Sequence, residues 1–287
     1  MKKKKKFSWI RVLSVTAVLF LVLVMGAVFW IQPKMVFNPA PKLIATPAVY
    51  ELDFEEVRVE ERGLSVAGWL VRTSEEVRRG SVLCCMSSAG NRSYELDTAM
   101  FFTKAGFDVL LFDYPGFADS TGRLSEKHCY EAARMMFDYL RAEDGFGPLL
   151  VYGRARGAAV AAHLAGERSP DALVLEAAYA SLPEQAAEQM GRMRHLILWD
   201  FQTLEFLKRV HVPVFFAHSR ADREVPIALG RRVFEAFDGK KEFFETGGLH
   251  GDTLTVCAPA YEEALNGFLE GLGSRGSVGV GDAGVGE

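Results

Sequence analysis

The sequence predicts an α/β fold in which helices cover a mostly parallel sheet. Five short runs are almost continuously apolar, as in strands that are buried on both faces. Helical patterns separate these runs, and 49% of the 287 residues are hydrophobic, enough for one sizeable core. The runs are SVLCCMSS at 81–88, FDVLLFDYPG at 107–116, PLLVYG at 148–153, DALVLEAAY at 171–179 and VPVFFAHS at 212–219.

The N-terminal residues predict a single transmembrane anchor at 12–31. This stretch carries no charge, and its twenty residues at 1.5 Å each match a hydrocarbon core of about 30 Å. A secretory signal peptide is the alternative, but the apolar run is long for one and no small-x-small cleavage site follows it closely. Residues 1–11 hold six positive charges, so we expect this basic segment to be cytoplasmic and the main domain to be extracytoplasmic.

Residues 32–50 contain four prolines and are expected to form an extended linker. The predicted domain, residues 51–272, begins with apolar and polar residues that alternate on both sides of Arg62 and Gly63. This alternation is typical of an antiparallel hairpin. The fold class is therefore a mostly parallel sheet with an N-terminal antiparallel hairpin.

Two apolar stripes predict amphipathic helices, and two further segments lie outside the sheet. The stripes run from Cys129 to Leu140, with Ser125 as N-cap, and from Tyr261 to Leu272. Residues 183–209 are longer than a simple connection needs, which predicts a small helical cap. The glycine-rich tail, 273–287, has no apolar pattern and is expected to be disordered.

Charge and cysteine usage exclude several classes of function. Residues 35–287 hold 26 basic and 37 acidic residues, so this part is acidic and nucleic acid is not expected as a partner. The four cysteines show neither metal spacing nor a disulfide framework, although an oxidising compartment would permit a distant pairing. Adjacent Cys84 and Cys85 should point to opposite faces of a strand as buried thiols. We expect no metal and no organic cofactor.

The segment Gly153-Arg154-Ala155-Arg156-Gly157 matches the pattern Gly-x-Ser-x-Gly, with alanine in place of the central serine. In that pattern a strand enters a helix through a sharp turn, so the flanking residues must be small and the central residue is raised above the sheet. Here LLVYG provides the strand and RGAAVAAHLAG the helix. This context favours a nucleophile elbow over an ordinary strand-to-helix turn.

From about Phe37 to Leu272 the chain resembles the membrane-anchored α/β-hydrolases of the serine aminopeptidase-like superfamily, which includes esterases, thioesterases and depalmitoylases. The matching segments are AGNRS at 89–93, LLFDYPGFADSTG at 110–122, YGRARGAAVA at 152–161, LEAAYASL at 175–182, HSRADREVP at 218–226 and GGLHGD at 247–252. The resemblance implies an α/β-hydrolase fold and a triad in the order nucleophile, acid, base. Its positions fall on Ala155, Asp222 and His250. The other histidines are interpreted as structural or surface residues: His128, His163, His195, His211 and His218.

Two parts of the catalytic machinery depart from the family. Ala155 has no hydroxyl and cannot form an acyl-enzyme. Where the family commonly has His-Gly-Asn, this chain has Met86, Ser87 and Ser88, so the oxyanion hole that the amide of Arg156 would complete is altered as well. Two altered parts favour loss during evolution over a single engineered substitution. Ser87, Ser88 or an activated water is the remaining source of a nucleophile.

These observations leave two main functional hypotheses. By descent the protein is a membrane-anchored hydrolase of ester, thioester or amide bonds, with His250 as base and Asp222 as its orienting acid. As written, the sequence favours an inactive or strongly impaired member that keeps the pocket for a ligand or partner. The aromatic and aliphatic cap permits an acyl or other small-molecule ligand near the membrane. A purely structural membrane protein would instead have no pocket above Ala155.

Overall fold

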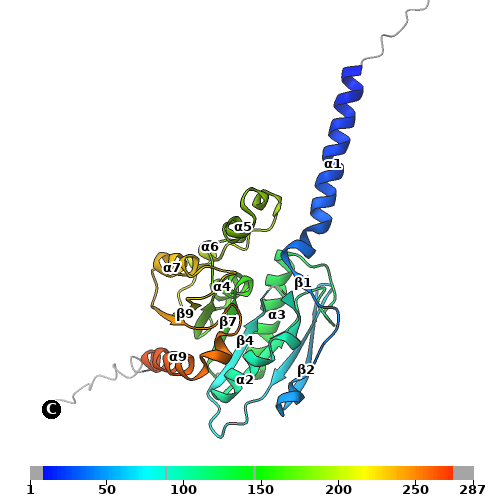
Figure 1. Cartoon of the computed structure of the whole chain (residues 1–287). Helices are drawn as coiled ribbons and strands as arrows, with labels where there is room; N and C mark the ends of the chain where they lie inside the picture. The colour runs from blue at the N-terminus through cyan, green and yellow to red at the C-terminus, as the bar shows by residue number, and fades with distance from the viewer. Residues whose placement is uncertain (1–8, 88, 145–146, 274–287) are drawn as a thin grey trace, which may run out of the picture.

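The computed structural model describes residues 9–87, 89–144 and 147–273. Within this part, eight strands form one sheet in the order β10-β9-β8-β7-β4-β6-β3-β2 (Figure 1). Their bounds are β2 (Phe54–Glu61), β3 (Leu64–Val71), β4 (Gly80–Cys85), β6 (Phe107–Phe112), β7 (Leu149–Arg154), β8 (Ala172–Glu176), β9 (Val214–Ser219) and β10 (Lys241–Thr246).

The sheet is mostly parallel, as predicted. Strand β3 pairs antiparallel with β2 and with β6, and the remaining neighbours pair in parallel. The predicted hairpin is confirmed, because Arg62 and Gly63 form its turn and both have positive φ. Parallel strands place all their carboxyl ends at one edge of the sheet, where sites of α/β proteins are found.

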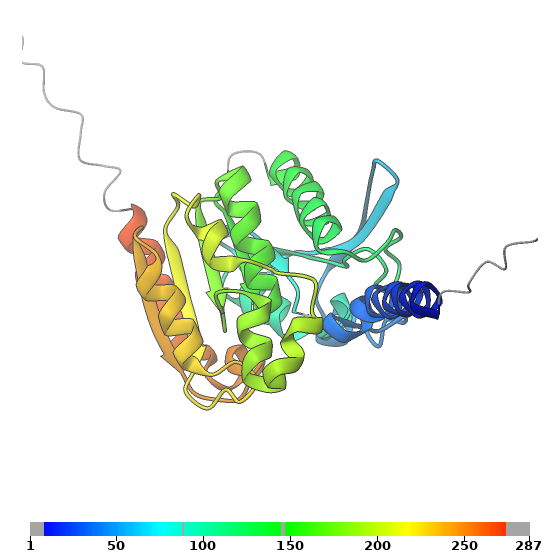
Figure 2. The same ribbon diagram turned by 90° about the horizontal axis from the view of Figure 1, so that it is seen from above.

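Helices cover both faces of the sheet (Figure 2). One face packs against α3 (Glu126–Asp144), α4 (Arg156–Arg168) and α7 (Ile227–Ala236), and the other against α2 (Leu96–Lys104), α8 (Thr253–Val256) and α9 (Ala258–Gly273). Cys85 belongs to the first core and Cys84 to the second, so the two thiols are buried on opposite faces as expected. Helix α3 also starts as predicted, since the Ser125 hydroxyl accepts a hydrogen bond from the His128 amide at 3.2 Å.

The predicted cap lies between β8 and β9. It consists of α5 (Leu182–Met190), the 3₁₀ helix η3 (Gly191–Leu196) and α6 (Thr203–Leu207). Ser181 caps α5 by accepting a hydrogen bond from the Glu184 amide. Figure 1 shows the cap on the side of the domain from which α1 leaves.

Helix α1 (Trp9–Val36) leaves the domain and contains a 24-residue segment, Arg11–Lys34, whose most apolar 18-residue window has a mean hydropathy of 2.8. No residue of this window is buried in the protein. The helix is therefore long and apolar enough to span a membrane, which agrees with the anchor expected at 12–31. The basic residues 2–6 and the tail residues 274–287 lie outside the described residues.

The expectation of an extended linker over 32–50 is wrong at its start, because α1 continues to Val36. Pro33 lacks an N–H, but its carbonyl still accepts a hydrogen bond from the Phe37 amide at 2.9 Å, so the helix passes through the proline. Gln32 is buried and exchanges hydrogen bonds with the cap, at the Leu196 carbonyl and the Leu198 amide. The end of α1 is thus part of the domain.

The rest of this linker follows the domain surface. Strand β1 (Asn38–Pro39) pairs with the short strand β5 (Ala89–Gly90), and the 3₁₀ helix η1 (Pro47–Tyr50) precedes β2. The side chain of Asn91, just before the 3₁₀ helix η2 (Arg92–Tyr94), donates hydrogen bonds to the carbonyls of Ala40 and Lys42. These contacts fix the connector against the carboxyl end of β4.

Candidate functional site

Ala155 stands in the sharp turn between β7 and α4, where the sequence predicts an elbow. Its φ of 51° and ψ of −112° are unusual for a residue with a side chain, and such backbone costs about 1–3 kcal/mol. The surrounding strands hold it there, because the Ala155 amide donates to the Glu176 carbonyl at 2.9 Å. The strained turn that lifts a nucleophile in hydrolases is therefore present without the nucleophile.

The glycines on either side of Ala155 are required by close packing. A Cβ on Gly157 would lie 2.1 Å from the Cys85 carbonyl oxygen and 2.4 Å from that of Met86. A Cβ on Gly153 would lie 2.4 Å from the Gly157 carbonyl oxygen. Gly157 therefore allows the first turn of α4 to touch the end of β4, and Gly153 allows that turn to pack against β7.

We expect Gly157→Ala to destabilise the protein by about 3 kcal/mol, since backbone atoms must move to admit the methyl group. Gly267→Ala is the matched control, because nothing lies within 4 Å of the added Cβ in helix α9. That change should be neutral or stabilising by about 0.5–1 kcal/mol. Denaturant unfolding of the full chain in detergent micelles measures both, and equal stabilities would contradict the tight contact at 157.

His250 and Asp222 form a hydrogen-bonded pair at the carboxyl edge of the sheet. Asp222 lies in the turn after β9 and His250 in the loop after β10. The His250 Nδ1–H donates to Asp222 Oδ2 at 2.8 Å, while Asp222 Oδ1 accepts from the amides of Glu224 and Val225 at 2.9 and 2.8 Å. This is the geometry by which a carboxylate fixes the tautomer and orientation of an imidazole.

The electrostatics of the pair favour a charged imidazole. Burial alone would raise the pKa of Asp222, but hydrogen bonds from His250 and the two amides outweigh it and hold the pKa below its ordinary value. Burial alone would lower the pKa of His250, but the Asp222 hydrogen bond and the charges of Asp222 and Glu224 raise it. The pair is thus set to stabilise an imidazolium.

His218 is close to the pair but has a structural role, as the sequence suggests. Its Nε2 hydrogen-bonds to the Val225 carbonyl at 2.8 Å and lies 3.7 Å from Asp222 Oδ2. The ring is buried, which lowers the pKa of His218 and keeps it neutral. It packs so closely on Gly230 that a Cβ there would lie 2.0 Å from Nδ1. His218 therefore supports the turn that carries Asp222.

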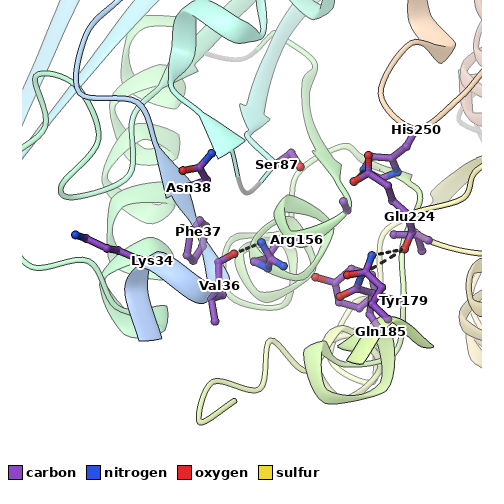
Figure 3. A pocket seen from close by; sticks show the side chains of 13 residues that line it. Lys34, Val36, Phe37, Asn38, Ser87, Arg156, Tyr179, Gln185, Glu224 and His250 are labelled. Atoms are coloured by element: carbon purple, nitrogen blue, oxygen red, sulfur yellow. Dashed lines mark hydrogen bonds and ion pairs between the residues drawn. The ribbon is translucent and has the colours of Figure 1, made fainter. Parts of the chain in front are cut away.

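A cavity of about 210 Å³ joins the predicted site residues (Figure 3). Ala155, Arg156, Ser87 and His250 all line it, and Asp222 lies behind His250. Ser88 lies outside the described residues. No group of three or more His, Cys, Asp or Glu residues suited to a metal ion occurs in the described ranges.

Several residues of this cavity were not expected from the sequence. Lys34, Val36, Phe37 and Asn38 come from the end of α1 and the start of the connector, and others come from the cap and from the turn after β9. Phe37 is buried against aromatic rings of the domain and the cap: Tyr114, Phe117, Trp199 and Phe201. The available signal in the sequence was Phe37 itself, an aromatic residue inside a proline-rich connector, which indicates a segment packed against the domain. The further lining residues are Tyr179, Gln185, Gln189, Glu224 and Val225.

A buried ion pair lies beneath the elbow and reaches the loop of His250. Arg154 donates through Nη2 to both carboxylate oxygens of Glu95, at 3.0 and 2.9 Å, and through Nη1 to the Gly251 carbonyl at 3.2 Å. Nearby, the Tyr152 hydroxyl donates to Glu176 at 2.9 Å, and burial raises the pKa of that carboxyl. Arg154 therefore connects β7 to the residue that follows His250.

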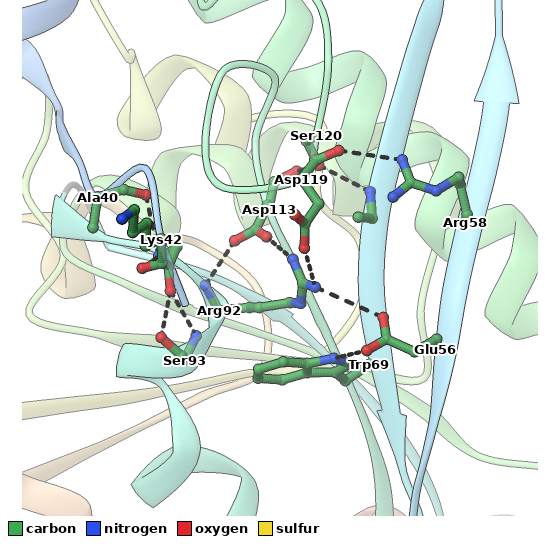
Figure 4. Close-up of polar contacts among 12 residues, drawn as sticks. Ala40, Lys42, Glu56, Arg58, Trp69, Arg92, Ser93, Asp113, Asp119 and Ser120 are labelled. Carbon is green, nitrogen blue, oxygen red and sulfur yellow. Dashed lines mark hydrogen bonds and ion pairs between the residues drawn. The ribbon is translucent and has the colours of Figure 1, made fainter. Parts of the chain in front are cut away.

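A second buried cluster holds the loops that follow β5 and β6 (Figure 4). Arg92 and Asp113 are almost fully buried; the guanidinium and the backbone amide of Arg92 both donate to the Asp113 carboxylate. Arg92 also donates to Asp119 at 2.8 Å and lies over the Trp69 ring at 4.4 Å. The sequence segments AGNRS and LLFDYPGFADSTG are thus joined by the ion pairs of Arg92 with Asp113 and Asp119.

Comparisons with known proteins agree with this geometry. Residues 91–206 match the family described as serine aminopeptidase, S33. The protein Rv2307c of Mycobacterium tuberculosis is 30% identical over 268 residues, which cover 90% of this chain and 95% of that protein. The lysophosphatidylserine lipase ABHD12 of Rattus norvegicus is 27% identical over 56% of this chain, but that match spans only 46% of the lipase.

Solved structures show the same fold. The esterase Pf2001 of Pyrococcus furiosus superposes with a TM-score of 0.68 at 18% identity, over 83% of this chain and 98% of the esterase. An alpha-beta hydrolase of Vibrio vulnificus gives a TM-score of 0.65 at 18% identity, over 77% of this chain and 82% of that chain. The fold, the family match and the similarity to Rv2307c over nearly its full length all support the same assignment. This chain has the α/β-hydrolase fold and belongs to the serine aminopeptidase S33 family.

Proposed function

We propose that this protein is a membrane-anchored member of the family that no longer hydrolyses esters and uses the inherited pocket for binding. The observation that carries the proposal is the intact cavity around Ala155, into which His250 still faces. An alanine methyl group cannot attack a carbonyl carbon, and loss of a serine nucleophile costs about a millionfold in turnover. The fold and the orienting pair are kept although the reaction that they served lacks its nucleophile.

The apolar helix α1 supports the anchoring. Its length and hydropathy suit a membrane span, and the cytoplasmic side is assigned to the N-terminus by the charges of residues 1–11. Lys34 lies in the last turn of this helix, Asn38 follows the helix, and both line the cavity, so the cavity would lie beside the membrane surface. The lipase and esterase named among the similar proteins indicate ester hydrolysis as the ancestral chemistry.

Ser87 provides the alternative that the protein is an active hydrolase. Its side chain lies in the same cavity as His250, so a displaced serine or a water molecule activated by His250 would be the nucleophile. Two observations argue against this alternative. His250 Nε2 lies 3.9 Å from a carboxylate oxygen of Glu224, and Ser87 does not occupy the elbow. An elbow works through a geometry that the end of a neighbouring strand does not reproduce.

The two functions differ in the turnover of simple esters. We expect full-length protein in detergent micelles to hydrolyse p-nitrophenyl butyrate no faster than its His250→Ala variant, because no nucleophile faces the imidazole. Initial rates at 405 nm over a range of protein concentrations measure this. Turnover above background that disappears in His250→Ala would establish the alternative. Its loss in Ser87→Ala as well would identify the serine rather than an activated water as the nucleophile.

A further inference from the structure

Positive charge predominates among the side chains that line the cavity. Lys34, Arg156 and His250 face it. Burial alone would lower the pKa of His250, but the hydrogen bond to Asp222 and the charge of that carboxylate raise it. Glu224 is the acidic residue of the described lining, and 67% of its side chain is exposed to solvent. Exposure screens this carboxylate more than it screens the partly buried side chains of Arg156 and His250.

Arg156 differs from the other buried arginines of the domain because no carboxylate pairs with it in the described residues. Its Nη1 donates to the Val36 carbonyl, its guanidinium lies 5.3 Å from the centre of the Phe37 ring, and its Nε is buried without a hydrogen-bond partner in that part of the chain. Arg92 and Arg154 are both paired with carboxylates, at 2.8 and 2.9 Å. Buried cations are normally paired.

The surroundings of Arg156 suit an anion. Arg156 is the first residue of α4, a 13-residue helix whose first amides lack partners within the helix and give this end a partial positive charge. The buried Tyr179 hydroxyl lies beside the guanidinium, whose charge partly offsets the effect of burial on the pKa of that phenol. The vacant position above the Ala155 methyl, where a serine oxygen would stand, completes the site.

The volume and position of the cavity limit what can bind. At about 210 Å³ it is smaller than the 300–1,000 Å³ or so of typical small-molecule pockets, so it suits a head group better than an acyl chain. Lys34 and the residues after it line the cavity directly at the end of α1. With α1 in a membrane, as the proposed function requires, a ligand that enters here would come from the membrane interface.

We propose that the cavity binds an oxyanion, the carboxylate or phosphate head of a single-chain membrane amphiphile, with Arg156 as its principal partner. Arg156 offers a rigid fork of donors that matches two oxygens of such a group, and Lys34 adds a second charge at the membrane side. The proposal rests on the proposed function, because a lasting complex requires that the site does not turn over esters.

Binding of dodecanoate to the full chain in dodecylmaltoside micelles tests this, with dodecanol as the uncharged probe of equal chain length. We expect saturable binding of dodecanoate that weakens as NaCl is raised, and no saturable binding of dodecanol. Arg156→Gln should weaken dodecanoate binding about tenfold or more, the value of one charge-assisted hydrogen bond. Equilibrium dialysis with radiolabelled probes gives both affinities.

Two variants separate loss of the site from loss of the fold. Arg192→Gln removes the same charge from an exposed position of the cap and should leave binding unchanged. Lys34→Gln alters an exposed side chain that cannot disturb the core, and we expect it to weaken binding severalfold. Circular dichroism of Arg156→Gln shows whether that variant is folded; if it is not, Lys34→Gln and the salt dependence carry the test.

Inorganic phosphate and butyrate distinguish the source of the oxyanion. If inorganic phosphate or butyrate bound as tightly as dodecanoate and displaced it, the cavity would be a site for soluble anions. That result would overturn the membrane origin of the ligand. Equal binding of dodecanol and dodecanoate, or unchanged binding in both Arg156→Gln and Lys34→Gln, would overturn the oxyanion site itself. Ester turnover that depends on His250 would instead contradict the proposed function. Because turnover and binding are measured separately, failure of the proposed function can be told apart from failure of the oxyanion site.

Discussion

Ala155→Ser is expected to make the full-length protein react covalently with a fluorophosphonate probe and to raise p-nitrophenyl ester turnover by several orders of magnitude. The backbone at 155 already has the strained elbow conformation, with φ at 51°, so the serine hydroxyl would be raised into the cavity. His250 faces the same cavity and is oriented by Asp222 at 2.8 Å. Nucleophile loss costs about a millionfold in serine hydrolases, which sets the scale of the gain.

The Ala155→Ser, His250→Ala double variant is the control, and it should remain unlabelled because nothing activates the new hydroxyl. Labelling and rates are compared in detergent micelles with the parent chain. A folded Ala155→Ser protein that is neither labelled nor active would contradict the expectation. It would place a second defect in the segment Met86, Ser87 and Ser88, where the family commonly has His-Gly-Asn.

Arg92→Met is expected to destabilise the protein by about 3–5 kcal/mol. The change leaves the Asp113 carboxylate fully buried with no cation beside it, and removing one partner of a buried ion pair typically has a cost of this size. The contact of the guanidinium with the Trp69 ring is lost as well. Chemical denaturation of the full chain in detergent, followed by near-ultraviolet circular dichroism, measures the change.

Arg58→Met, which removes an arginine from strand β2, is the matched control for Arg92→Met. Arg58 donates to the Ser65 hydroxyl and the Asp119 carbonyl but is exposed, so its removal should cost less than about 1 kcal/mol. Adding Asp113→Asn to Arg92→Met should recover part of the lost stability, because the uncompensated charge is then absent. Equal costs for Arg92→Met and Arg58→Met would show that the burial of the pair contributes nothing.

The sequence predicted the sheet because its signal is local. Strands buried on both faces, such as β4 and β7, are continuous apolar runs, and the hairpin of β2 and β3 alternates residue by residue around Arg62 and Gly63. The elbow was also predictable, since only small residues at 153 and 157 permit the approach of α4 to β4. Patterns of this kind are set by neighbours in the chain.

The end of α1 and the cavity wall could not be predicted in the same way. Pro33 and the prolines after it indicate an extended connector, but contacts of Gln32 with the cap extend the helix to Val36. Lys34 and Ala155 line the same cavity although they are 121 residues apart in the chain. No local sequence pattern predicts that two such distant residues lie close together. Asn91 is buried and holds the connector in place through hydrogen bonds to the carbonyls of Ala40 and Lys42, about 50 residues earlier in the chain.

The sequence by itself determined the fold class, the helix long enough for a membrane and the alanine at the centre of the elbow, because each depends on residue type and spacing along the chain. Only the tertiary structure decided that His250 is held by Asp222, that the connector lines the cavity and that Arg156 faces it without a carboxylate in the described residues. These depend on which loops meet at the carboxyl edge of the sheet. Packing between distant segments sets that arrangement, since burial of a charge or an aromatic ring is defined only when its neighbours are in place.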